Sequence, residues 1–390
     1  MPPDALMLQR SAVHRVACAV VAAEVRRIRE TELPEALRYD WPDAVPIGAT
    51  GLGLDSLEQL GAVGALAETF DLDDGMLGAE RAQTVGDWVD WVMKAHRSRA
   101  GRICVRTSGS TGAPRLCAHS VADILDEAAL WAERCADRRR VVALVPASHL
   151  YGMIWTAVLP SLLGVPVRRA TVGLSMGLAA GDLVVAVPEQ WEALLRLMRR
   201  FPEGVVGVSS AGPLDDRLAR NLIAAGLTQL IDVYGSSETA AIGTRIVPSS
   251  DYDLLPRWTM TARGEGDWQL VDRTGTTADF PDYIERTGER SLRPVGRRDG
   301  AVQVAGHNVW PERIAQLLRD SDGVAEATVR LGATGRLKAF IVPLAGQDPT
   351  TLAIDLERAV AHLAGHERPK SFRFGSRLPR NGMGKLCDWA

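Results

Sequence analysis

Thr107-Ser-Gly-Ser-Thr-Gly-Ala-Pro-Arg115 is a loop rich in hydroxyl groups and glycine that ends in a cation. Such a loop can wrap a polyphosphate, because glycine lets backbone N–H groups approach oxygen anions and Arg115 adds a permanent positive charge. An apolar strand, expected at residues 103–106, precedes the loop, as is usual for a phosphate cradle. The loop does not end in Gly-Lys-Ser/Thr, so a P-loop NTPase is disfavoured. Ordinary turns share its composition, and the motifs that follow it therefore decide the interpretation.

The chain around this loop alternates between short apolar strands and helical patterns. Strands are expected at residues 103–106, 141–145, 183–187, 204–208 and 229–233, and a helix is expected at 121–134. This alternation predicts an α/β body with a largely parallel sheet. The last ninety or so residues read as a small α+β domain. Its expected strands lie near 301–304, 325–330 and 337–342, and its expected helices near 311–319 and 350–364.

Three helical patterns come before the loop, at residues 11–30, 56–70 and 85–93. The first has a broad apolar face with Val13, Val16, Val20, Val25 and Ile28, which predicts a helix packed on a core.

Composition narrows the class of protein. The 390 residues suggest two or three domains, and the 46% hydrophobic and 24% charged residues are ordinary for a soluble globular protein. A net charge of −3 gives no reason to expect nucleic acid or an anionic membrane as a partner. The five cysteines contain no C-x-x-C pair, and no long apolar run or signal sequence is evident. A cytoplasmic location is therefore expected.

Further motifs follow the loop in a fixed order. They are Pro146-Ala-Ser-His-Leu-Tyr-Gly152, Ser209-Ser-Ala-Gly-Pro-Leu214, Tyr234-Gly-Ser-Ser-Glu238, Gly296-Arg-Arg-Asp299 and Leu378-Pro-Arg-Asn-Gly-Met-Gly-Lys385. Together with the loop they resemble the motif series of the adenylate-forming superfamily of acyl-CoA synthetases, adenylation domains and luciferases. The resemblance covers about residues 103–390. It implies an α/β fold with a large adenylate-forming core, a small mobile C-terminal α+β lid domain and a helical N-terminal region, divided as 1–97, 98–298 and 299–390.

The resemblance also implies roles for individual residues. In it Tyr234 stacks on adenine, Ser237 contacts the α-phosphate and Glu238 helps to hold Mg²⁺. The residues that would bind ATP are Thr107, Ser108, Gly109, Ser110, Thr111, Gly112, Arg115, Ser210, Ala211, Gly212, Tyr234, Gly235, Asp282 and Arg297. Asp282 is matched to the ribose-binding aspartate because its separation from Gly296 is that of the family, whereas Glu289 lies too close. Thr287-Gly288 then becomes a hairpin turn.

The implied chemistry explains these residue types. A carboxylate attacks the α-phosphate of ATP, and the two anions repel each other unless their charge is neutralised. Mg²⁺ on Glu238 and the Lys385 ammonium would spread the developing charge. A hinge at Arg298 and Asp299 would let the lid turn for the transfer step. His149 is matched to the family position beside the acyl pocket.

Simpler interpretations stand beside these roles. Lys385 reads as a solvated tail lysine, Glu238 as the first acid of a helix, and His149 or Tyr234 as core residues. Asp282 reads as a plain loop carboxylate and Asp299 as a cap.

The N-terminal stretch resembles an acyl carrier protein at Gly53-Leu-Asp-Ser-Leu-Glu58, which would place phosphopantetheine on Ser56. A capping box, in which Ser56 caps the helix and Gln59 reaches back, explains the same residues.

The sequence therefore favours ATP-dependent activation of an aryl or modest acyl carboxylic acid to acyl-AMP, followed by transfer to a thiol. This preference follows the resemblance to compact ligases of secondary metabolism. The acceptor stays open between CoA, a separate acyl carrier protein, Ser56 and an amine. A non-catalytic nucleotide-binding protein of the same fold is the alternative from another class.

Overall fold

The computed structural model describes residues 7–30, 40–72, 82–98, 101–107, 115–173, 176–264, 267–379 and 386–389. They form two compact units, the first running to Trp258 and the second starting at Thr259. These units do not coincide with the expected limits near residues 97 and 298, and the three-part division of the chain stays a prediction.

The first unit contains a twisted sheet whose central strands are parallel, as the sequence predicts. Within the first unit its strands run in the order β9-β8-β7-β6-β5-β3-β4, and of these only β8 and β9 run antiparallel to the rest or to each other. Their bounds are β3 (Arg140–Ala143), β4 (Val167–Arg169), β5 (Asp182–Ala186), β6 (Val206–Ser209), β7 (Gln229–Ser236), β8 (Ala240–Ile246) and β9 (Tyr252–Leu254).

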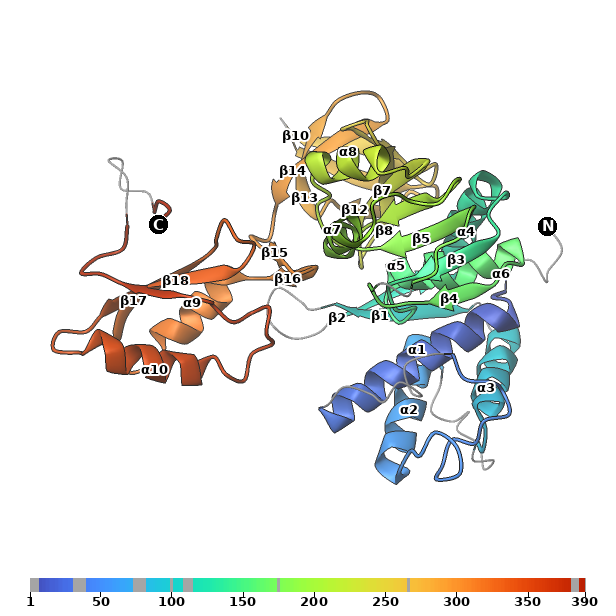
Figure 1. The fold of residues 1–390 in the computed structure, drawn as a ribbon, viewed down its shortest axis with the longest axis horizontal. Helices are drawn as coiled ribbons and strands as arrows, with labels where there is room; N and C mark the ends of the chain where they lie inside the picture. The colour runs from blue at the N-terminus through green and yellow to red at the C-terminus, as the bar shows by residue number, and fades with distance from the viewer. Residues whose placement is uncertain are drawn as a thin grey trace. The chain divides into compact units, whose positions relative to one another are not determined.

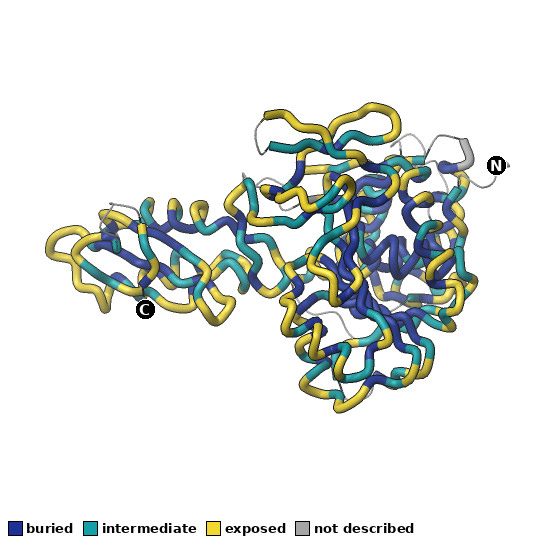
Figure 2. Tube along the Cα trace, turned by 90° about the horizontal axis from the view of Figure 1, so that it is seen from above, coloured by how far each residue is buried: buried dark blue, intermediate teal, exposed yellow. Residues whose placement is uncertain are grey.

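Helices cover both faces of this sheet (Figure 1). Val142, Val184 and Leu230 point to one face and pack on α7 (Pro188–Leu197) and α8 (Asp216–Ala224). Three short segments make one continuous helix that contacts β3 and packs on α4 (Val121–Arg134). These segments are α5 (Leu150–Met153), η4 (Ile154–Val158, a π-helical turn) and α6 (Leu159–Leu163). The buried residues gather along this layered core, drawn dark blue in Figure 2.

The three N-terminal helices are α1 (Arg10–Arg29), α2 (Ser56–Thr69) and α3 (Val85–Ser98), the last running five residues further than expected. Helix α1 packs against α2 and α3 and also contacts η4 and α6. The Ser11 Oγ lies 2.5 Å from the Ser161 Oγ of α6. The predicted apolar stripe of α1 is buried at Val13, Val16, Val20 and Val25 and half-buried at Ile28.

One expected strand is placed differently. Residues 103–106 belong to β1 (Arg102–Thr107), which pairs antiparallel with β2 (Arg115–Ser120) rather than joining the parallel sheet. The seven residues between these strands allow a hairpin, whereas a parallel crossover needs a dozen or more residues. The predicted phosphate loop therefore connects two strands of one hairpin.

The second unit begins within β10 (Trp258–Gly264), which pairs with β11 (Asp267–Asp272), and β11 pairs with β12 (Thr277–Asp279). Two hairpins follow, β13 (Asp282–Arg286) with β14 (Ser291–Arg297), and β15 (Val302–Val304) with β16 (His307–Val309). Backbone bonds from Thr287 and Gly288 to Ser291 O close the first of these hairpins, which confirms the predicted turn there.

The last part of the second unit has the predicted α+β character. Strands β17 (Val324–Leu331), β18 (Leu337–Pro343) and β19 (Phe372–Phe374) form a sheet, and α9 (Pro311–Arg319) and α10 (Pro349–Ala359) share an apolar core with it. Helix α10 ends five residues before the expected end. Leu363 still packs on this core, from a turn in which its N–H bonds Val360 O at 3.1 Å.

Candidate active site

Several of the motif loops leave the carboxyl ends of the parallel strands, where ligands of open α/β sheets bind. Pro146–Gly152 comes shortly after β3, Ser210 directly follows β6, and Ser237 directly follows β7. The Tyr151 hydroxyl lies 3.1 Å from Ala186 O and 3.0 Å from Val208 O, which ties this loop to the ends of β5 and β6. The motif loops of β3 and β6 are thus held at one edge of the sheet.

The loop after β6 has an unusual backbone. Ala211 adopts φ = 66°, a left-handed conformation that non-glycine residues rarely take and that is concentrated at functional sites. The Ser210 Oγ donates to Val233 O at 2.8 Å, which fastens the loop to β7. Two of the predicted ATP-binding residues, Ser210 and Ala211, therefore lie in a loop that is fixed to the strand carrying Tyr234.

Ser237 and Glu238 lie in the tight turn of the β7–β8 hairpin, so the interpretation of Glu238 as the first acid of a helix is wrong. Ser236 and Thr239 brace this turn, with the Ser236 Oγ accepting from the Glu238 N–H at 3.2 Å. At Gly235 an added Cβ would lie 2.2 Å from Ala240 O, so the close approach of the two strands requires glycine. Glu238 is exposed at the tip of the turn.

A buried histidine on β2 holds the same turn. The His119 Nε2 lies 2.7 Å from Ser237 O, and because a carbonyl oxygen only accepts, Nε2 carries the proton. Burial lowers the pKa of His119, which keeps the ring neutral. The hairpin that carries the predicted phosphate loop is thereby bonded to the turn that carries Ser237 and Glu238.

A buried carboxyl group bonds to the start of β8 in the β7–β8 hairpin. Glu127 of α4 accepts from the Ala241 N–H at 3.3 Å, and burial raises its pKa to about 7. The sequence does not point to His119 or Glu127 as site residues, because a histidine on a strand and an acid on a helix carry no motif of their own.

The remaining candidates of the first unit are placed as follows. Tyr234 is half-buried, with its ring 5.5 Å from the ring of Tyr252. His149 is exposed at the residue before α5, so its interpretation as a packed core histidine is wrong. The backbones of Thr107 and Arg115 are partners in the β1–β2 register. Ser108, Gly109, Ser110, Thr111 and Gly112 lie outside the described residues.

In the second unit, Asp282 and Arg297 are paired in register across β13 and β14. Asp282 is buried on a strand, so its interpretation as a plain loop carboxylate is wrong. Arg297 forms two hydrogen bonds with Asp299, at 3.1 and 2.7 Å. Arg298 bonds Asp282 O at 3.1 Å and Asp267 Oδ1 at 2.5 Å. The predicted hinge residues are thus connected to the strand that carries Asp282.

Lys385 lies outside the described residues, but the chain on either side of it is placed. The Cys387 N–H donates to Pro379 O at 3.0 Å, which brings the two ends of the segment together. The Lys338 Nζ pairs with Asp388 at 2.8 Å and lies 4.9 Å from the Trp389 ring. The tail after Lys385 is therefore anchored on β18.

The start of α2 corrects one expectation. Asp55, not Ser56, is the N-cap: its side chain accepts from the Glu58 N–H at 2.8 Å, and the Glu58 side chain accepts from the Asp55 N–H at 2.9 Å. Gln59 instead donates to Leu54 O at 2.7 Å. The carboxylate of Asp55 reaches the N–H three residues on, so the box is shifted by one residue. Ser56 is left exposed in the first turn.

Similar proteins of known family place this chain. A family model described as "AMP-binding enzyme" matches residues 103–309, more than half of the chain. This chain belongs to the AMP-binding enzyme family. It is similar to the 4-coumarate–CoA ligase of Halorhodospira halophila, with 38% identity over 88% of this chain and 89% of the relative. The 4-coumarate–CoA ligase of Rhodobacter capsulatus is 37% identical over 97% of this chain and 100% of the relative.

Solved structures agree on the fold. The o-succinylbenzoate CoA synthetase of Bacillus subtilis superposes with a TM-score of 0.59 at 20% identity, over 73% of this chain and 67% of that one. A malonyl-CoA ligase superposes with a TM-score of 0.55 at 20% identity, over 71% of each chain. The predicted α/β fold is thus confirmed. This enzyme is an ATP-dependent acid–thiol ligase that activates a carboxylic acid as acyl-AMP.

No described helix is both long and apolar enough to cross a bilayer. No group of three or more His, Cys, Asp or Glu side chains suited to a metal ion occurs within the described ranges. Mg²⁺ that arrives with ATP is commonly held by one or two carboxylates and the phosphates, a role that the exposed Glu238 fits.

Proposed function

We propose that this enzyme activates an aryl acid of the 4-coumarate class and transfers the acyl group to CoA. The observation that carries the proposal is the similarity to the Rhodobacter capsulatus ligase, which extends over nearly the whole of both chains. A third relative, the 4-coumarate–CoA ligase of Cereibacter sphaeroides, is 33% identical over 100% of this chain and 98% of the relative.

In the proposed adenylation step, a carboxylate oxygen of the acid attacks the α-phosphorus of ATP and pyrophosphate leaves. Tyr234 and the loop Ser210–Gly212 bind the adenine, and Ser237 donates to the α-phosphate. Thr107, residues 108–112 and Arg115 hold the β- and γ-phosphates. Glu238 would help to hold Mg²⁺, which would supply Lewis-acid neutralisation of the phosphate charge. The support from the structure is that His119 and the Ser236–Thr239 bonds fix the turn on which Ser237 and Glu238 lie.

Asp282 binds the ribose hydroxyls in this proposal, and its in-register partner Arg297 lies beside it. Lys385 donates to the acyl-AMP oxygens as charge develops. A rotation of the lid domain at Arg298 and Asp299 then withdraws Lys385 from the site and brings in the thiol-binding surface. In the second step the thiol loses its proton and its sulfur attacks the acyl carbon. The acyl carbon–oxygen bond then breaks, and AMP leaves. His149, exposed beside the start of α5, lines the acyl pocket.

CoA is the acceptor in this proposal. A phosphopantetheine arm, on a separate carrier or on Ser56, is the alternative acceptor of the same chemistry. A 24% identical relative, the 3,4-dihydroxybenzoate–[aryl-carrier protein] ligase of Bacillus anthracis, covers 72% of this chain and acts on such a carrier by its name. Ser56 is exposed, as a modification site must be. An intact-mass measurement after incubation with CoA and a phosphopantetheinyl transferase decides whether Ser56 is modified.

The test is formation of thioester and pyrophosphate from MgATP, CoA and a panel of aryl and fatty acids. We expect 4-coumarate or a close aryl acid to turn over best. Lys385→Ala should lower the rate of pyrophosphate release about 100- to 1,000-fold, the usual effect of losing one preorganised donor. Lys370→Ala, which removes an exposed lysine of the same unit, is the matched control and should leave the rate unchanged. If folded protein that binds ATP forms no thioester or pyrophosphate with any acid of the panel, the proposal is overturned.

A further inference from the structure

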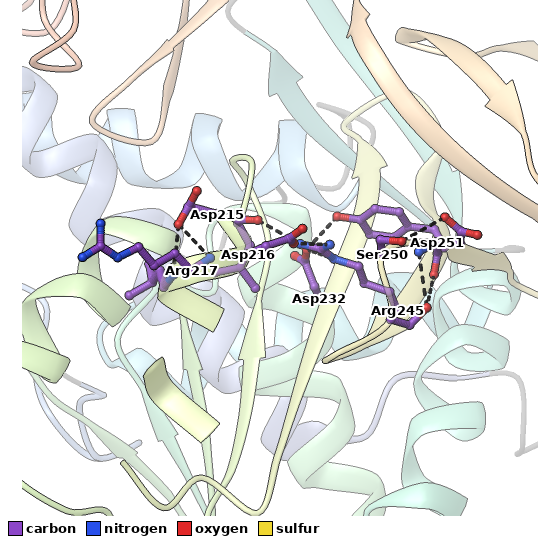
Figure 3. A network of polar contacts seen from close by, with 11 residues as sticks. Asp215, Asp216, Arg217, Asp232, Arg245, Ser250 and Asp251 are labelled. Atoms are coloured by element: carbon purple, nitrogen blue, oxygen red, sulfur yellow. Dashed lines mark hydrogen bonds and ion pairs between the residues drawn. The ribbon is translucent and has the colours of Figure 1, made fainter. Parts of the chain in front are cut away.

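A largely buried ion-pair network connects β7, β8 and α8 of the first unit (Figure 3). At its centre is Arg245 of β8, which is 6% exposed. Each nitrogen of its guanidinium has a different partner: Nε donates to Asp232 Oδ2 at 2.9 Å, Nη1 to Asp216 Oδ1 at 2.8 Å, and Nη2 to Leu214 O at 2.8 Å. One side chain thereby connects β7, the start of α8 and the end of the Ser209–Leu214 loop.

Tyr252 of β9 completes the network. Its hydroxyl donates to Asp232 Oδ2 at 2.6 Å, and the Arg245 guanidinium lies 5.2 Å from the centre of its ring. The ring of Tyr252 also lies against the ring of Tyr234. The two ring centres are 5.5 Å apart and the ring planes are inclined at 54°. Tyr252 therefore backs the side chain that is proposed to stack on adenine.

The network holds both parts of the predicted base-binding surface. The Ser209–Leu214 loop is fastened at its beginning by the Ser210 bond to Val233 O and at its end by the Arg245 bond to Leu214 O. Between these points lies Ala211 in its left-handed conformation. A loop that contains a strained residue keeps its shape only when its surroundings fix it.

Stability alone gives no strong reason for such a network. Buried ion pairs often contribute little net stability, because the loss of hydration offsets the attraction of the charges. A planar guanidinium with three fixed partners does give directional positioning.

We infer that Asp232, Arg245 and Tyr252 are positioning residues for the nucleotide base: they set the Ser209–Leu214 loop and the Tyr234 ring in the geometry that binds adenine. This inference rests on the proposed function, which places adenine between these two features. It predicts that changes in these three residues weaken binding of the base but not binding of the acid or of pyrophosphate.

The chain offers a matched control. Arg140 forms a second two-point pair with a buried aspartate, with Nε 3.0 Å and Nη2 2.6 Å from the oxygens of Asp182. Arg140 and Asp182 are in register at the amino ends of β3 and β5, the edge of the sheet opposite to the motif loops. Arg245→Lys and Arg140→Lys thus make the same chemical change at the two edges of one sheet.

The experiment measures the Kd of MgATP, AMP and magnesium pyrophosphate by calorimetry, together with kcat and the KM values for ATP and acid. Arg245→Lys and Tyr252→Leu should raise the Kd of ATP and of AMP about 5- to 20-fold and leave the Kd of pyrophosphate and the KM for acid within twofold. Tyr252→Phe keeps the ring and should restore most of the affinity that Tyr252→Leu loses. Arg140→Lys should lower the melting temperature without changing any Kd.

Equal nucleotide affinity of Arg245→Lys, Tyr252→Leu and wild type would overturn the inference, as would an equal loss in Arg140→Lys. If Arg245→Lys does not fold, the comparison of Tyr252→Leu with Tyr252→Phe decides. A wild type that binds MgATP and AMP but turns over no acid would contradict the proposed function alone, because the Kd comparison still tests the network. A wild type that binds no nucleotide would contradict both.

Discussion

At the scale of single residues, two buried groups next to the β7–β8 turn make hydrogen bonds in surroundings that disfavour charge. His119 donates to Ser237 O, and Glu127 accepts from the Ala241 N–H. Burial lowers the pKa of the histidine and raises that of the acid, so both shifts favour the neutral form. Both groups thus bond to the β7–β8 hairpin while burial disfavours a charge on either of them.

Glu127 makes stability depend on pH. Its pKa is about 7 in the folded protein and 4.5 ordinarily, so its contribution to stability is complete below pH 4.5 and is lost as pH rises to about 7. Glu127→Gln cannot ionise. It should therefore be more stable than wild type at pH 8, by up to roughly 3 kcal/mol, with the difference shrinking towards pH 4.5. Urea unfolding at a series of pH values checks this.

Glu58 provides a control of opposite sign. Its hydrogen bond with Arg29 lowers its pKa, so its contribution is present above its ordinary value of 4.5 and is lost as pH falls further. Glu58→Gln should be less stable than wild type at pH 8. If Glu127→Gln shows no pH-dependent advantage while Glu58→Gln behaves as expected, the assignment of Glu127 is wrong.

His119→Ala should affect catalysis as well as stability. Removing the ring leaves Ser237 O without its donor and should cost about 1–3 kcal/mol of unfolding free energy. Because Ser237 and Glu238 share this turn, we also expect kcat to fall at least tenfold. His96 offers a comparison, since it is also buried, with Nε2 3.2 Å from Phe70 O on another part of the first unit. His96→Ala should lose stability but keep kcat, and equal kcat in both variants would rule out a positioning role for His119.

At the scale of elements, the C-terminal tail is the anchor of the segment that carries Lys385. Trp389 packs edge-on against Phe340 of β18, with ring centres 5.5 Å apart, and Lys338 binds the same tail. Trp389→Ala should therefore slow pyrophosphate release about tenfold while leaving the KM for ATP unchanged, because Lys385 loses its placement and the nucleotide pocket does not. Single-turnover kinetics would measure this, and an unchanged rate would separate the tail from the Lys385 segment.

The elements also show where sequence reasoning works and where it stops. Helix α4 begins and ends at the predicted residues, since its apolar period and its Ser120 cap are local signals. The pairing of β1 with β2 depends on the length of the loop between them, and β2 itself was not predicted. The cap at Asp55 was assigned one residue late, because Asp and Ser at adjacent positions offer the same chemistry.

The candidate site divides in the same way. Tyr234, Ser237 and Glu238 are candidates from the sequence because they lie close together in one motif. Arg245, Asp232 and Tyr252 are not, because strand pairing and helix packing bring them together from different stretches. The roles of the motif residues stay predictions, as do those of Lys385 and residues 108–112, which lie outside the described part of the chain.

At the scale of the whole molecule, the N-terminal helices are joined to the α/β core of the first unit. Arg169 of β4 pairs with Asp40 at 3.3 Å, and Gln9 accepts from the Ser161 hydroxyl at 2.8 Å. Native-state hydrogen exchange should therefore show α1 and β5 losing protection at the same denaturant concentration. Loss of protection in α1 well before β5 would instead support an independent carrier-like domain at residues 1–97.

Activation of the acid as acyl-AMP leaves a mark on the products. In that chemistry a carboxylate oxygen becomes the bridge to the α-phosphorus and stays on AMP when the thiol breaks the acyl carbon–oxygen bond. The most direct measurement is mass spectrometry of AMP formed from MgATP, CoA and 4-coumarate labelled with ¹⁸O in its carboxylate. We expect one ¹⁸O atom in each AMP and none in pyrophosphate. Unlabelled AMP, or label in pyrophosphate or phosphate, would contradict it.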